Sequence, residues 1–460
     1  MDLTLQELLN VMALRFEYTG ERKRLSRSLA GISTDSRNVL ANEVYFALRG
    51  EHYDGHNFVE DALKKGALAA VVEKTWSENH ERKIAKPIFV VDDTLKALQE
   101  LSRYYRTKFS LPVLGLTGTN GKTTTKEMIA AVLSTAGSVC KTAGNLNNHI
   151  GVPLTLFKLA RDHRFAVVEM GTNHFGEITR LCEIAEPNLG VITNIGRGHL
   201  EFLGNLEGVA RAKMELFDSL PADAVAFVNL EDSLIVKHSS KPKNKITYGF
   251  RDEARVIARV LEPDPLGFPR MRVEKQIFTL NVFGNHNLLN ALAAVAVGLE
   301  FGVSLKTMKT ALANVSVPGK RLEVIKRNDT LILNDSYNAN PDSTLAALAI
   351  LKEMKTTGKR IFVFGDMLEL GEAAAEEHAR IGNVLRDFNV NLLLAFGPLA
   401  AKAVDAARQS HGVIVAQHFA DKQDLIAELK KRLATGDVLL VKGSRSMKME
   451  DIVTAIDWIN

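Results

Sequence analysis

Residues 115–125, which read GLTGTNGKTTT, restrict the possible folds of this chain more than any other segment. The apolar run 111–116 predicts a buried strand, and residues 126–136 predict a helix. Gly118 and Gly121 let the backbone curl so that successive N–H groups point at one anion, and the helix N-terminus adds its positive end. A strand, a glycine-rich loop and a helix in this order predict an α/β fold with a phosphate-binding loop at a sheet edge.

Lys122 and Thr123 supply the chemistry that such a loop needs. Lys122 would place a positive charge beside the outer phosphates of a nucleoside triphosphate, and the Thr123 hydroxyl would reach a Mg²⁺ ion. The strict pattern G-x4-G-K-[ST] is not met, because position 116 is Leu and the first glycine is Gly115. A glycine-rich turn that binds nothing is the alternative, but Gly-Lys-Thr after a strand is a specific context, and we predict that a nucleoside triphosphate binds here with Mg²⁺. The other loop residues expected to contact the nucleotide are Thr117, Gly118, Thr119, Asn120, Gly121 and Thr124.

Chain length, composition, net charge and cysteine content indicate which class of protein this chain belongs to. The chain has 460 residues, 46% hydrophobic and 24% charged, which is typical of a soluble globular protein with about two to four domains. A net charge of +4 without a basic block does not indicate a nucleic-acid partner. Two distant cysteines, Cys140 and Cys182, fit a reducing compartment. With no signal peptide or apolar span in the sequence, we expect a cytoplasmic location. Several domains around a nucleotide loop indicate an enzyme, which we expect to be a monomer acting on small molecules.

The chain divides into three expected domains, namely 1–85, 86–316 and 317–460. Lys86-Pro87 and Val317-Pro318-Gly319 are the boundary candidates. The first domain is expected to be a small α/β unit, and apolar strands alternate with helices in the other two, which predicts parallel sheets covered by helices.

Further elements are expected along this pattern. Residues 245–284 look like a small antiparallel insertion, and residues 287–299 are an Ala/Leu-rich helix. The expected strands are 44–48, 67–72, 113–116, 165–168, 189–193, 330–333, 361–364, 392–396 and 438–441. Several of these run into a glycine, so ligands are expected at the carboxyl edge of the sheets.

Three residues near the edge of the central sheet are candidate metal ligands, and each could instead have a structural or surface role. Glu169 ends an apolar strand, so its carboxylate should emerge near the phosphate loop, where an oxygen ligand suits Mg²⁺; it could also be a solvent-facing glutamate. His199 follows the next strand and could equally be a hydrogen-bonded structural group. Lys213 lies in a helical pattern and, taken alone, is a surface lysine.

Polar residues elsewhere in the chain have a structural interpretation as well as a functional one. Asn145 and Asn148 follow Gly144, as in a turn, and Asn285-His286-Asn287 opens a helix where Asn is a common cap. Arg321 can hold phosphate through two N–H groups and Asp335 can accept from sugar hydroxyls, but each could equally make an interdomain contact.

Together these residues resemble the Mur ligases, ATP-dependent enzymes of bacterial cell-wall synthesis. The ordered motifs are TGTNGKT, GNLNN, VEMG, TNIG followed by His199-Leu-Glu, ARA-Lys213, Asn285-His286-Asn287 and PGK-Arg321. The segments Ser33-Thr34-Asp35-Ser36-Arg37, YFALRG and Asp54-Gly55-His56 resemble the first domain of the branches that act on longer peptides. DSYNANP and GDMLELG at 365–371 are closest to the branch that adds D-alanyl-D-alanine, and the Asp-Asn-Pro-Arg motif of the MurE branch is absent.

The resemblance implies three domains: a UDP-binding one, a P-loop ATPase and a C-terminal Rossmann-like one. It implies that Lys122 contacts the terminal phosphates, that Thr123 and Glu169 serve one Mg²⁺, and that His199 serves a second. Lys213 matches a lysine that carries a carbamate in several relatives, which would make it an anionic oxygen ligand. The remaining implied contacts are Asn285 and Asn287 with adenine, Asp335 with ribose, Arg321 with a phosphate, Asn145 and Asn148 with the muramyl substrate, and Ser33, Asp35, Ser36, Arg37 and His56 with the UDP end.

The implied reaction joins D-alanyl-D-alanine to UDP-N-acetylmuramoyl-tripeptide through an acyl phosphate. The turns after Phe364 and Val441 are the expected site for the dipeptide. Other ligases of the superfamily, MurE-like or folylpolyglutamate synthase-like, are the nearest alternatives. A nucleotide-switched binding protein is a more distant alternative, as is a catalytically dead scaffold, which the intact Lys122 and Glu169 disfavour.

Overall fold

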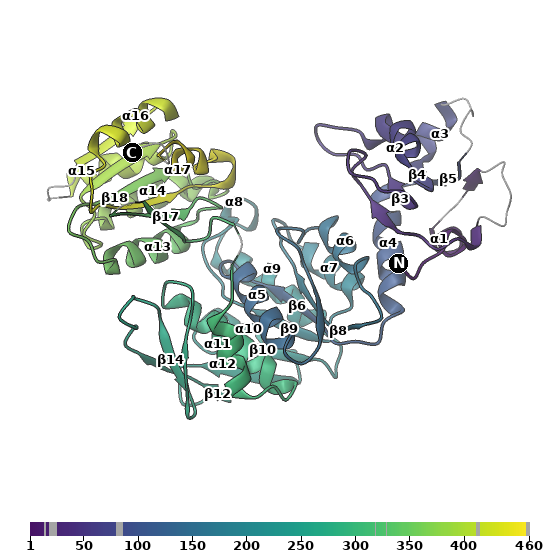
Figure 1. The fold of residues 1–460 in the computed structure, drawn as a ribbon, viewed down its shortest axis with the longest axis horizontal. Coiled ribbons are helices and arrows are strands. Elements are labelled where there is room, and N and C mark those ends of the chain that lie inside the picture. Colours follow the sequence, from purple (N-terminus) through teal and green to yellow (C-terminus); the bar gives the residue numbers. More distant parts are fainter. Residues whose placement is uncertain are drawn as a thin grey trace.

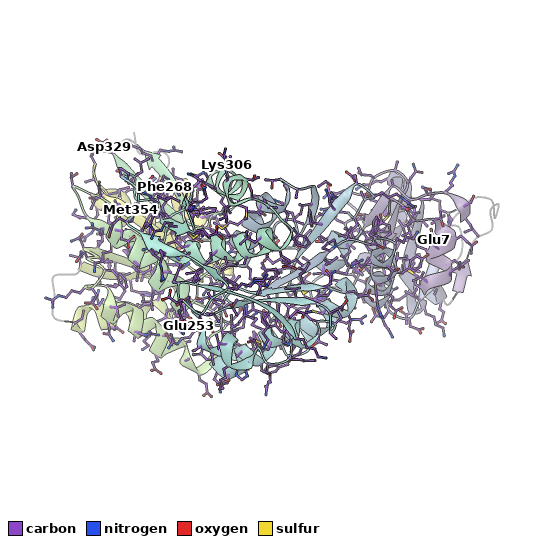
Figure 2. The ribbon with its side chains drawn as sticks, turned by 90° about the horizontal axis from the view of Figure 1, so that it is seen from below. Glu7, Glu253, Phe268, Lys306, Asp329 and Met354 are labelled. Atoms are coloured by element: carbon purple, nitrogen blue, oxygen red, sulfur yellow. The ribbon has the colours of Figure 1, made fainter. Side chains whose placement is uncertain are left out.

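The computed structural model describes residues 1–12, 15–17, 25–79, 86–317, 319–327, 329–410 and 415–456, and within these ranges three large sheets and one small three-stranded sheet lie along the chain. Figure 1 shows three lobes, with the central lobe below the N- and C-terminal ones. Figure 2 shows the molecule from below as an elongated body, with Glu7 near one end and Asp329 near the other. No helix within these ranges is long and apolar enough to cross a membrane.

The N-terminal lobe contains a five-stranded sheet in the order β1-β5-β4-β3-β2, parallel except for β1. Its strands are β1 (Arg15–Glu17), β2 (Gly31–Ser33), β3 (Glu43–Phe46), β4 (Ala69–Glu73) and β5 (Ile88–Val91). Its helices are α1 (Leu5–Met12), η2 (Gly55–Phe58), α2 (Val59–Lys65), α3 (Lys74–Asn79) and α4 (Thr94–Thr107). The sheet continues past residue 85, where we expected the first domain to end, because β5 pairs with β4.

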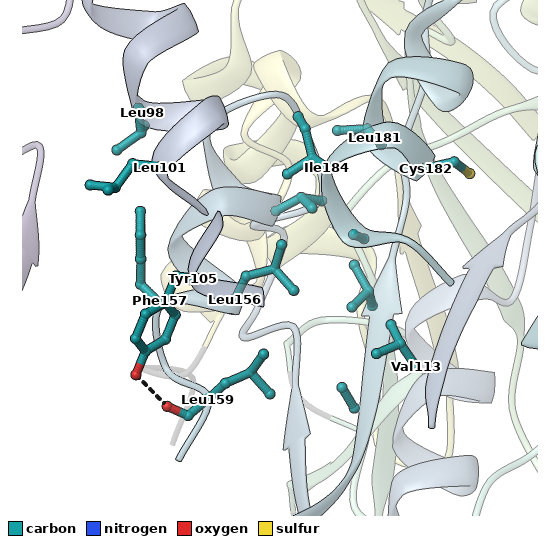
Figure 3. Packing of buried hydrophobic residues seen from close by; sticks show 14 of the residues in the cluster. Leu98, Leu101, Tyr105, Val113, Leu156, Phe157, Leu159, Leu181, Cys182 and Ile184 are labelled. Atoms are coloured by element: carbon teal, nitrogen blue, oxygen red, sulfur yellow. Dashed lines mark hydrogen bonds between the residues drawn. The ribbon is translucent and has the colours of Figure 1, made fainter. Parts of the chain in front are cut away.

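Helix α4 joins this lobe to the central one. Its apolar residues Leu98, Leu101 and Tyr105 recur at helical spacing and are buried in one cluster with α6 residues of the central lobe (Figure 3). The Tyr105 hydroxyl donates to the Leu159 carbonyl at 2.9 Å, so its polar end is satisfied within the cluster. The core of the first two lobes is therefore continuous on this side.

The central sheet has seven strands, all parallel, in the order β12-β11-β10-β9-β6-β8-β7. The strands are β6 (Val113–Thr117), β7 (Ser138–Lys141), β8 (His163–Glu169), β9 (Leu189–Ile192), β10 (Val225–Asn229), β11 (Asn244–Gly249) and β12 (Val256–Ile257). The helices are α5 (Lys122–Leu133), α6 (Gly151–Leu156), α7 (Glu177–Ala185), α8 (Leu200–Leu203), α9 (Leu206–Asp218), α10 (Ser233–His238), α11 (His286–Glu300) and α12 (Leu305–Ala313). Helices α5, α11 and α12 cover one face, and α6, α7, α9 and α10 cover the other.

Two sequence expectations are corrected here. Helix α5 begins at Lys122, four residues earlier than expected, because Gly121 takes a left-handed conformation (φ 78°) and starts the helix directly. Only part of 245–284 is an antiparallel insertion: β11 and β12 extend the parallel sheet, and β13 (Arg259–Leu261), β14 (Arg270–Val273) and β15 (Gln276–Thr279) form the separate antiparallel sheet.

The C-terminal lobe has a six-stranded sheet in the order β16-β17-β21-β18-β19-β20, parallel except for the edge strand β16. The strands are β16 (Glu323–Arg327), β17 (Thr330–Asp335), β18 (Arg360–Gly365), β19 (Leu392–Phe396), β20 (Val415–Phe419) and β21 (Val438–Lys442). The helices are α13 (Pro341–Glu353), η3 (Gly371–Ala373), α14 (Ala374–Val384), α15 (Ala400–Gln409), α16 (Lys422–Arg432), η4 (Arg445–Met447) and α17 (Glu450–Ile456).

This sheet has helices on both faces, so the three-lobed α/β architecture predicted from the sequence is confirmed. In the expected linker, Val317 and Gly319 lie between α12 and β16, and Pro318 lies outside the described residues.

Candidate active site

A pocket of about 780 Å³ lies between the central and C-terminal lobes. Its walls come from the loop after β6, the carboxyl ends of β8 and β9, the start of α11, and the segments after β17 and β18. These are the sheet edges where open parallel sheets bind ligands. The predicted residues that line it are Thr119, Asn120, Gly121, Lys122, Thr123, Thr124, Asn145, Asn148, Glu169, His199, Asn287, Arg321 and Asp335.

The phosphate loop has the strained backbone that glycine permits. Gly118 has a φ of 143°, and a Cβ on it would lie 1.9 Å from the Thr193 hydroxyl oxygen. Lys122 Nζ donates to the carbonyl oxygens of Gly118 (2.7 Å) and Thr119 (2.9 Å). Burial lowers the pKa of Lys122 to about 8, opposed by the Glu169 carboxylate and assisted by the positive charge of Arg321. A phosphate group in the pocket would favour the charged ammonium.

Glu169 is a buried carboxylate at the end of β8 with an incomplete set of partners. Its Oε1 accepts from Asn147 Nδ2 at 2.8 Å and lies 3.4 Å from the Thr123 hydroxyl. Its Oε2 accepts no hydrogen bond from the part of the chain that the structure describes, although Lys126 Nζ lies 3.3 Å away as an ion-pair partner. Carboxylate and hydroxyl oxygens fit Mg²⁺. Within the described part of the chain no three His, Cys, Asp or Glu residues cluster as a complete metal site, so phosphate and water oxygens would have to complete the shell.

His199 and Lys213 differ in their access to the pocket. His199 begins α8 with a left-handed backbone (φ 57°), lines the pocket, and its Nδ1 lies 2.6 Å from Glu369 Oε2 of the C-terminal lobe. Lys213 is fully buried on α9, its Nζ has no hydrogen-bond partner among the described residues, and it is not one of the residues that line the pocket. Burial, together with the charge of Lys122, lowers the pKa of Lys213 well below its usual value. An amine without its proton is the form that reacts with carbon dioxide, so the site fits the carbamate that the resemblance implies.

The start of α11 forms the far end of the pocket. Asn287 donates to the Phe283 carbonyl at 2.7 Å and accepts from Asn290 Nδ2 at 2.8 Å. His286 and Asn290 also line the pocket, whereas Asn285, which we expected to contact adenine, does not. Burial lowers the pKa of His286, which favours the neutral ring, a form that can accept as well as donate a hydrogen bond.

The C-terminal lobe contributes charged groups held by neighbours. The Arg321 guanidinium lies over the Tyr337 ring, 3.8 Å from its centroid. Asp335 Oδ1 accepts from the Leu322 N–H at 3.1 Å, and its Oδ2 lies 2.5 Å from the buried Lys442 ammonium. Tyr337 and Lys442 line the pocket and were missed, because their residue types carry no nucleotide signal without this packing.

Direct contacts hold the two lobes together beside the pocket. Asn120 of the phosphate loop accepts from Asn340 Nδ2 at 2.8 Å. Arg197 Nη1 lies 3.1 Å from Asp342 Oδ1, and its Nε lies 3.2 Å from Glu377 Oε1. The phosphate loop and the C-terminal lobe therefore meet in this conformation.

The predicted UDP-binding residues do not reach this pocket. Asp35 and Arg37 form an ion pair at 2.9 Å in the exposed turn after β2, and Ser33 Oγ accepts from the Asp35 N–H. His56 is buried, with Nδ1 2.6 Å from Asp54 Oδ1 and Nε2 accepting from the Glu73 N–H, so both ring nitrogens have partners within the lobe. The predicted residues outside the pocket lining are Ser33, Asp35, Ser36, Arg37, His56, Thr117, Gly118, Lys213 and Asn285.

Known proteins are similar to this chain over nearly its full length. Three family models match in chain order: "Mur ligase family, catalytic domain" at residues 28–106, "Mur ligase middle domain" at 116–298 and "Mur ligase, glutamate ligase domain" at 320–445. The UDP-N-acetylmuramoyl-tripeptide–D-alanyl-D-alanine ligase of Bacillus subtilis is 37% identical, with 92% of each chain covered. The Escherichia coli enzyme of the same name is 35% identical, covering 99% of this chain and 98% of that one.

Solved structures agree with these relatives. MurF from Acinetobacter baumannii has a TM-score of 0.85 at 30% identity, covering 98% of this chain and 97% of that one. MurF from Thermotoga maritima, solved in complex with ADP, has a TM-score of 0.80 at 28% identity, covering 93% of this chain and 97% of that one. With likeness over nearly the full length in both sequence and fold, this chain belongs to the Mur ligase family, in its MurF branch.

Proposed function

We propose that this chain is an ATP-dependent C–N ligase that joins D-alanyl-D-alanine to UDP-N-acetylmuramoyl-tripeptide. The observation that carries the proposal is the single pocket in which Lys122 and Glu169 of the central lobe face Arg321 and Asp335 of the C-terminal lobe. Such a pocket can hold a triphosphate between two lobes and bring an acceptor to it. The names of the full-length relatives supply the substrates.

The proposed reaction begins when the terminal carboxylate of the tripeptide attacks the γ-phosphorus of ATP. The bond from that phosphorus to the bridging oxygen breaks, and ADP leaves. The dipeptide amine then attacks the acyl phosphate carbon and loses a proton, and the tetrahedral intermediate collapses to an amide with release of phosphate. Two unit charges about 4 Å apart repel by about 4 kcal/mol at an effective dielectric of 20, so the carboxylate cannot approach the triphosphate without neutralising groups.

Residues of this chain supply that neutralisation. Lys122 and Arg321 bring positive charge from opposite walls of the pocket, where they can stabilise the equatorial oxygens of the transferred phosphoryl group. Bound Mg²⁺ would add Lewis-acid stabilisation of the phosphate oxygens. Thr123, Glu169 and His199 are the residues that would hold it, joined by Lys213 if that residue carries a carbamate.

The proposal also assigns residues to the nucleoside, to the muramyl substrate and to the UDP end. Asn287 and Asp335 contact the nucleoside, and Asn145 and Asn148 contact the muramyl substrate from the same pocket. The loop 33–37 of the N-terminal lobe holds the UDP end, away from the phosphate loop. The division into UDP-binding, ATPase and C-terminal ligase domains, with the first extended to include β5, belongs to the same proposal, as do a monomeric state and a cytoplasmic location.

The test is phosphate release from ATP with UDP-N-acetylmuramoyl-tripeptide, with and without D-alanyl-D-alanine. The proposal expects release that depends on the dipeptide, with one amide formed per phosphate. Amide formation with a free amino acid but not with the dipeptide would instead support a MurE-like enzyme. Phosphate release that no acceptor amine changes would overturn the ligase assignment and support a nucleotide switch.

A further inference from the structure

The GDMLELG segment after β18, residues 365–371, makes a direct contact with a residue that the proposed function uses. Glu369 Oε2 lies 2.6 Å from His199 Nδ1, and the Glu369 carbonyl accepts from the Glu201 N–H at 3.1 Å. Both His199 (φ 57°) and Glu369 (φ 63°) have left-handed backbones. Such conformations are strained in residues other than glycine and persist where the surroundings hold them, often at functional sites.

The segment is held firmly within its own lobe. Asp366 Oδ1 accepts from the Ala400 N–H at 2.7 Å, Met367 N–H donates to His378 Nε2 at 2.9 Å, and Leu368 N–H donates to Ser444 Oγ at 2.8 Å. Because three successive residues are anchored to different elements, Glu369 must move with the C-terminal lobe. Its contact with His199 therefore forms only when the two lobes meet.

The chemistry of this contact is that of a supported histidine ligand. A metal-binding histidine usually directs its other ring nitrogen to a carboxylate, which sets the tautomer and orientation of the ring and makes it a better donor to the metal. Among the described residues Nδ1 is at ion-pair distance from Glu369 Oε2 but has no hydrogen bond of regular geometry, so the ring has to turn to aim an Nδ1 proton at this carboxylate. With the proton there, the lone pair of the neutral ring lies on Nε2. Both residues line the pocket that would hold the cation.

We infer that Glu369 is a positioning residue for His199, and that docking of the C-terminal lobe completes the divalent-cation site. The inference rests on the proposed function, in which His199 is a cation ligand. It adds that one residue of the site is oriented across the lobe interface. Cation affinity and lobe docking are then linked: the cation favours the docked conformation as much as docking favours the cation.

The test uses Mn²⁺ as the probe, titrated into the full-length protein with a non-hydrolysable ATP analogue while free Mn²⁺ is followed by electron paramagnetic resonance. Glu369→Ala is expected to weaken one class of Mn²⁺ binding by about tenfold or more, the loss typical when the carboxylate behind a histidine ligand is removed. The matched control is Glu201→Ala, which removes an exposed carboxylate two residues from His199 that has no ion pair within the described ranges. That control should bind Mn²⁺ like the wild type.

A double-mutant comparison distinguishes a loss of Mn²⁺ affinity that acts through His199 from a loss that does not. In a His199→Ala background, Glu369→Ala should cause no further loss of Mn²⁺ affinity, because the ring through which it acts is gone. Further loss in that background, or wild-type affinity in Glu369→Ala alone, would overturn the inference. The Glu369 side chain is 42% exposed, so a near-wild-type melting temperature is expected and serves as the folding control.

Failure of this inference is distinguishable from failure of the proposed function. If wild-type protein shows dipeptide-dependent phosphate release while Glu369→Ala binds Mn²⁺ normally, only the positioning role is wrong. If the wild type shows no dipeptide-dependent release, the proposed function is wrong, whatever the Mn²⁺ titrations give.

Discussion

Among single residues, several charged groups in and near the pocket are buried, which is energetically unfavourable for their charged forms. Burial lowers the pKa of Lys122 to about 8, and Lys213 is buried without a hydrogen-bond partner within the described ranges. Asp335 and Lys442 form a buried pair at 2.5 Å. For the two lysines burial disfavours the charged form, and for the Asp335–Lys442 pair it makes each charge depend on its partner. Such perturbed charges are expected of groups that handle an anionic ligand.

Lys122→Met tests the first of these charges. Loss of one preorganised charge at the transferred phosphoryl group should lower kcat by about 10²- to 10³-fold. The lysine pKa is about 8 in the folded chain and about 10.4 in the unfolded one, so between these values the unfolded chain binds more protons and the stability of the wild type rises with pH. The melting temperature of nucleotide-free wild type, relative to Lys122→Met, should therefore rise between pH 8 and pH 10. A constant difference across that range would contradict the lowered pKa.

Asp335→Ala tests the buried pair. Removal of one partner leaves the Lys442 ammonium buried without its counter-charge, which should destabilise the protein by about 3 kcal/mol. Chemical denaturation measures this, and the double variant Asp335→Ala with Lys442→Met should recover part of the loss. Destabilisation by the double variant equal to the sum of the singles would show that the pair is not coupled.

At the scale of elements, glycine conformations decide where the loop can lie. The β6–loop–α5 unit requires Gly118 at a φ of 143°, close against Thr193 of the segment after β9. The unit was predictable because an apolar strand, glycines and a helix are local patterns. Strand β16 and the full extent of the first sheet were not, because β16 is an edge strand with no buried residue and β5 belongs to its sheet only through pairing with β4 and β1.

Gly118→Ala should displace the loop. A Cβ 1.9 Å from Thr193 Oγ1 adds a steric clash to the backbone strain, for an expected cost of about 3 kcal/mol in unfolding free energy. Gly302→Ala is the matched control, because Gly302 also has a positive φ (70°) but a Cβ there would meet nothing within 4 Å. Its expected cost is the strain alone, about 1 kcal/mol. Equal losses for the two variants would exclude the clash with Thr193 as the cause.

At the scale of the whole molecule, the pocket exists because two lobes dock. Arg197 reaches Asp342 and Glu377 across the interface, while Asn120 contacts Asn340. Arg321 and Asp335 are thereby placed opposite the phosphate loop. An acyl phosphate is labile in water, so a docked lobe that excludes water would protect the intermediate.

Arg197→Ala should weaken this docking. The loss of two partly exposed ion pairs is expected to reduce kcat/KM for ATP by about three- to tenfold, near 1 kcal/mol, and to increase the radius of gyration in small-angle scattering. Arg380→Ala is the matched control, because Arg380 pairs with the same Glu377 at 3.3 Å but lies within the C-terminal lobe. If both variants lower kcat/KM equally, the effect comes from Glu377 and not from docking.

The local units of this protein could be predicted from its sequence: the strand–loop–helix around Lys122, the parallel central strands, and Glu169 at the end of β8. These follow from apolar periodicity and glycine placement, which act over a few residues. The packing of distant elements was needed to show that Asn147 holds Glu169, that Tyr337 lies under Arg321, that Lys442 pairs with Asp335 and that His56 accepts from the Glu73 N–H. Those contacts join side chains from distant elements, and such convergence depends on how sheets and lobes pack, which no local pattern encodes.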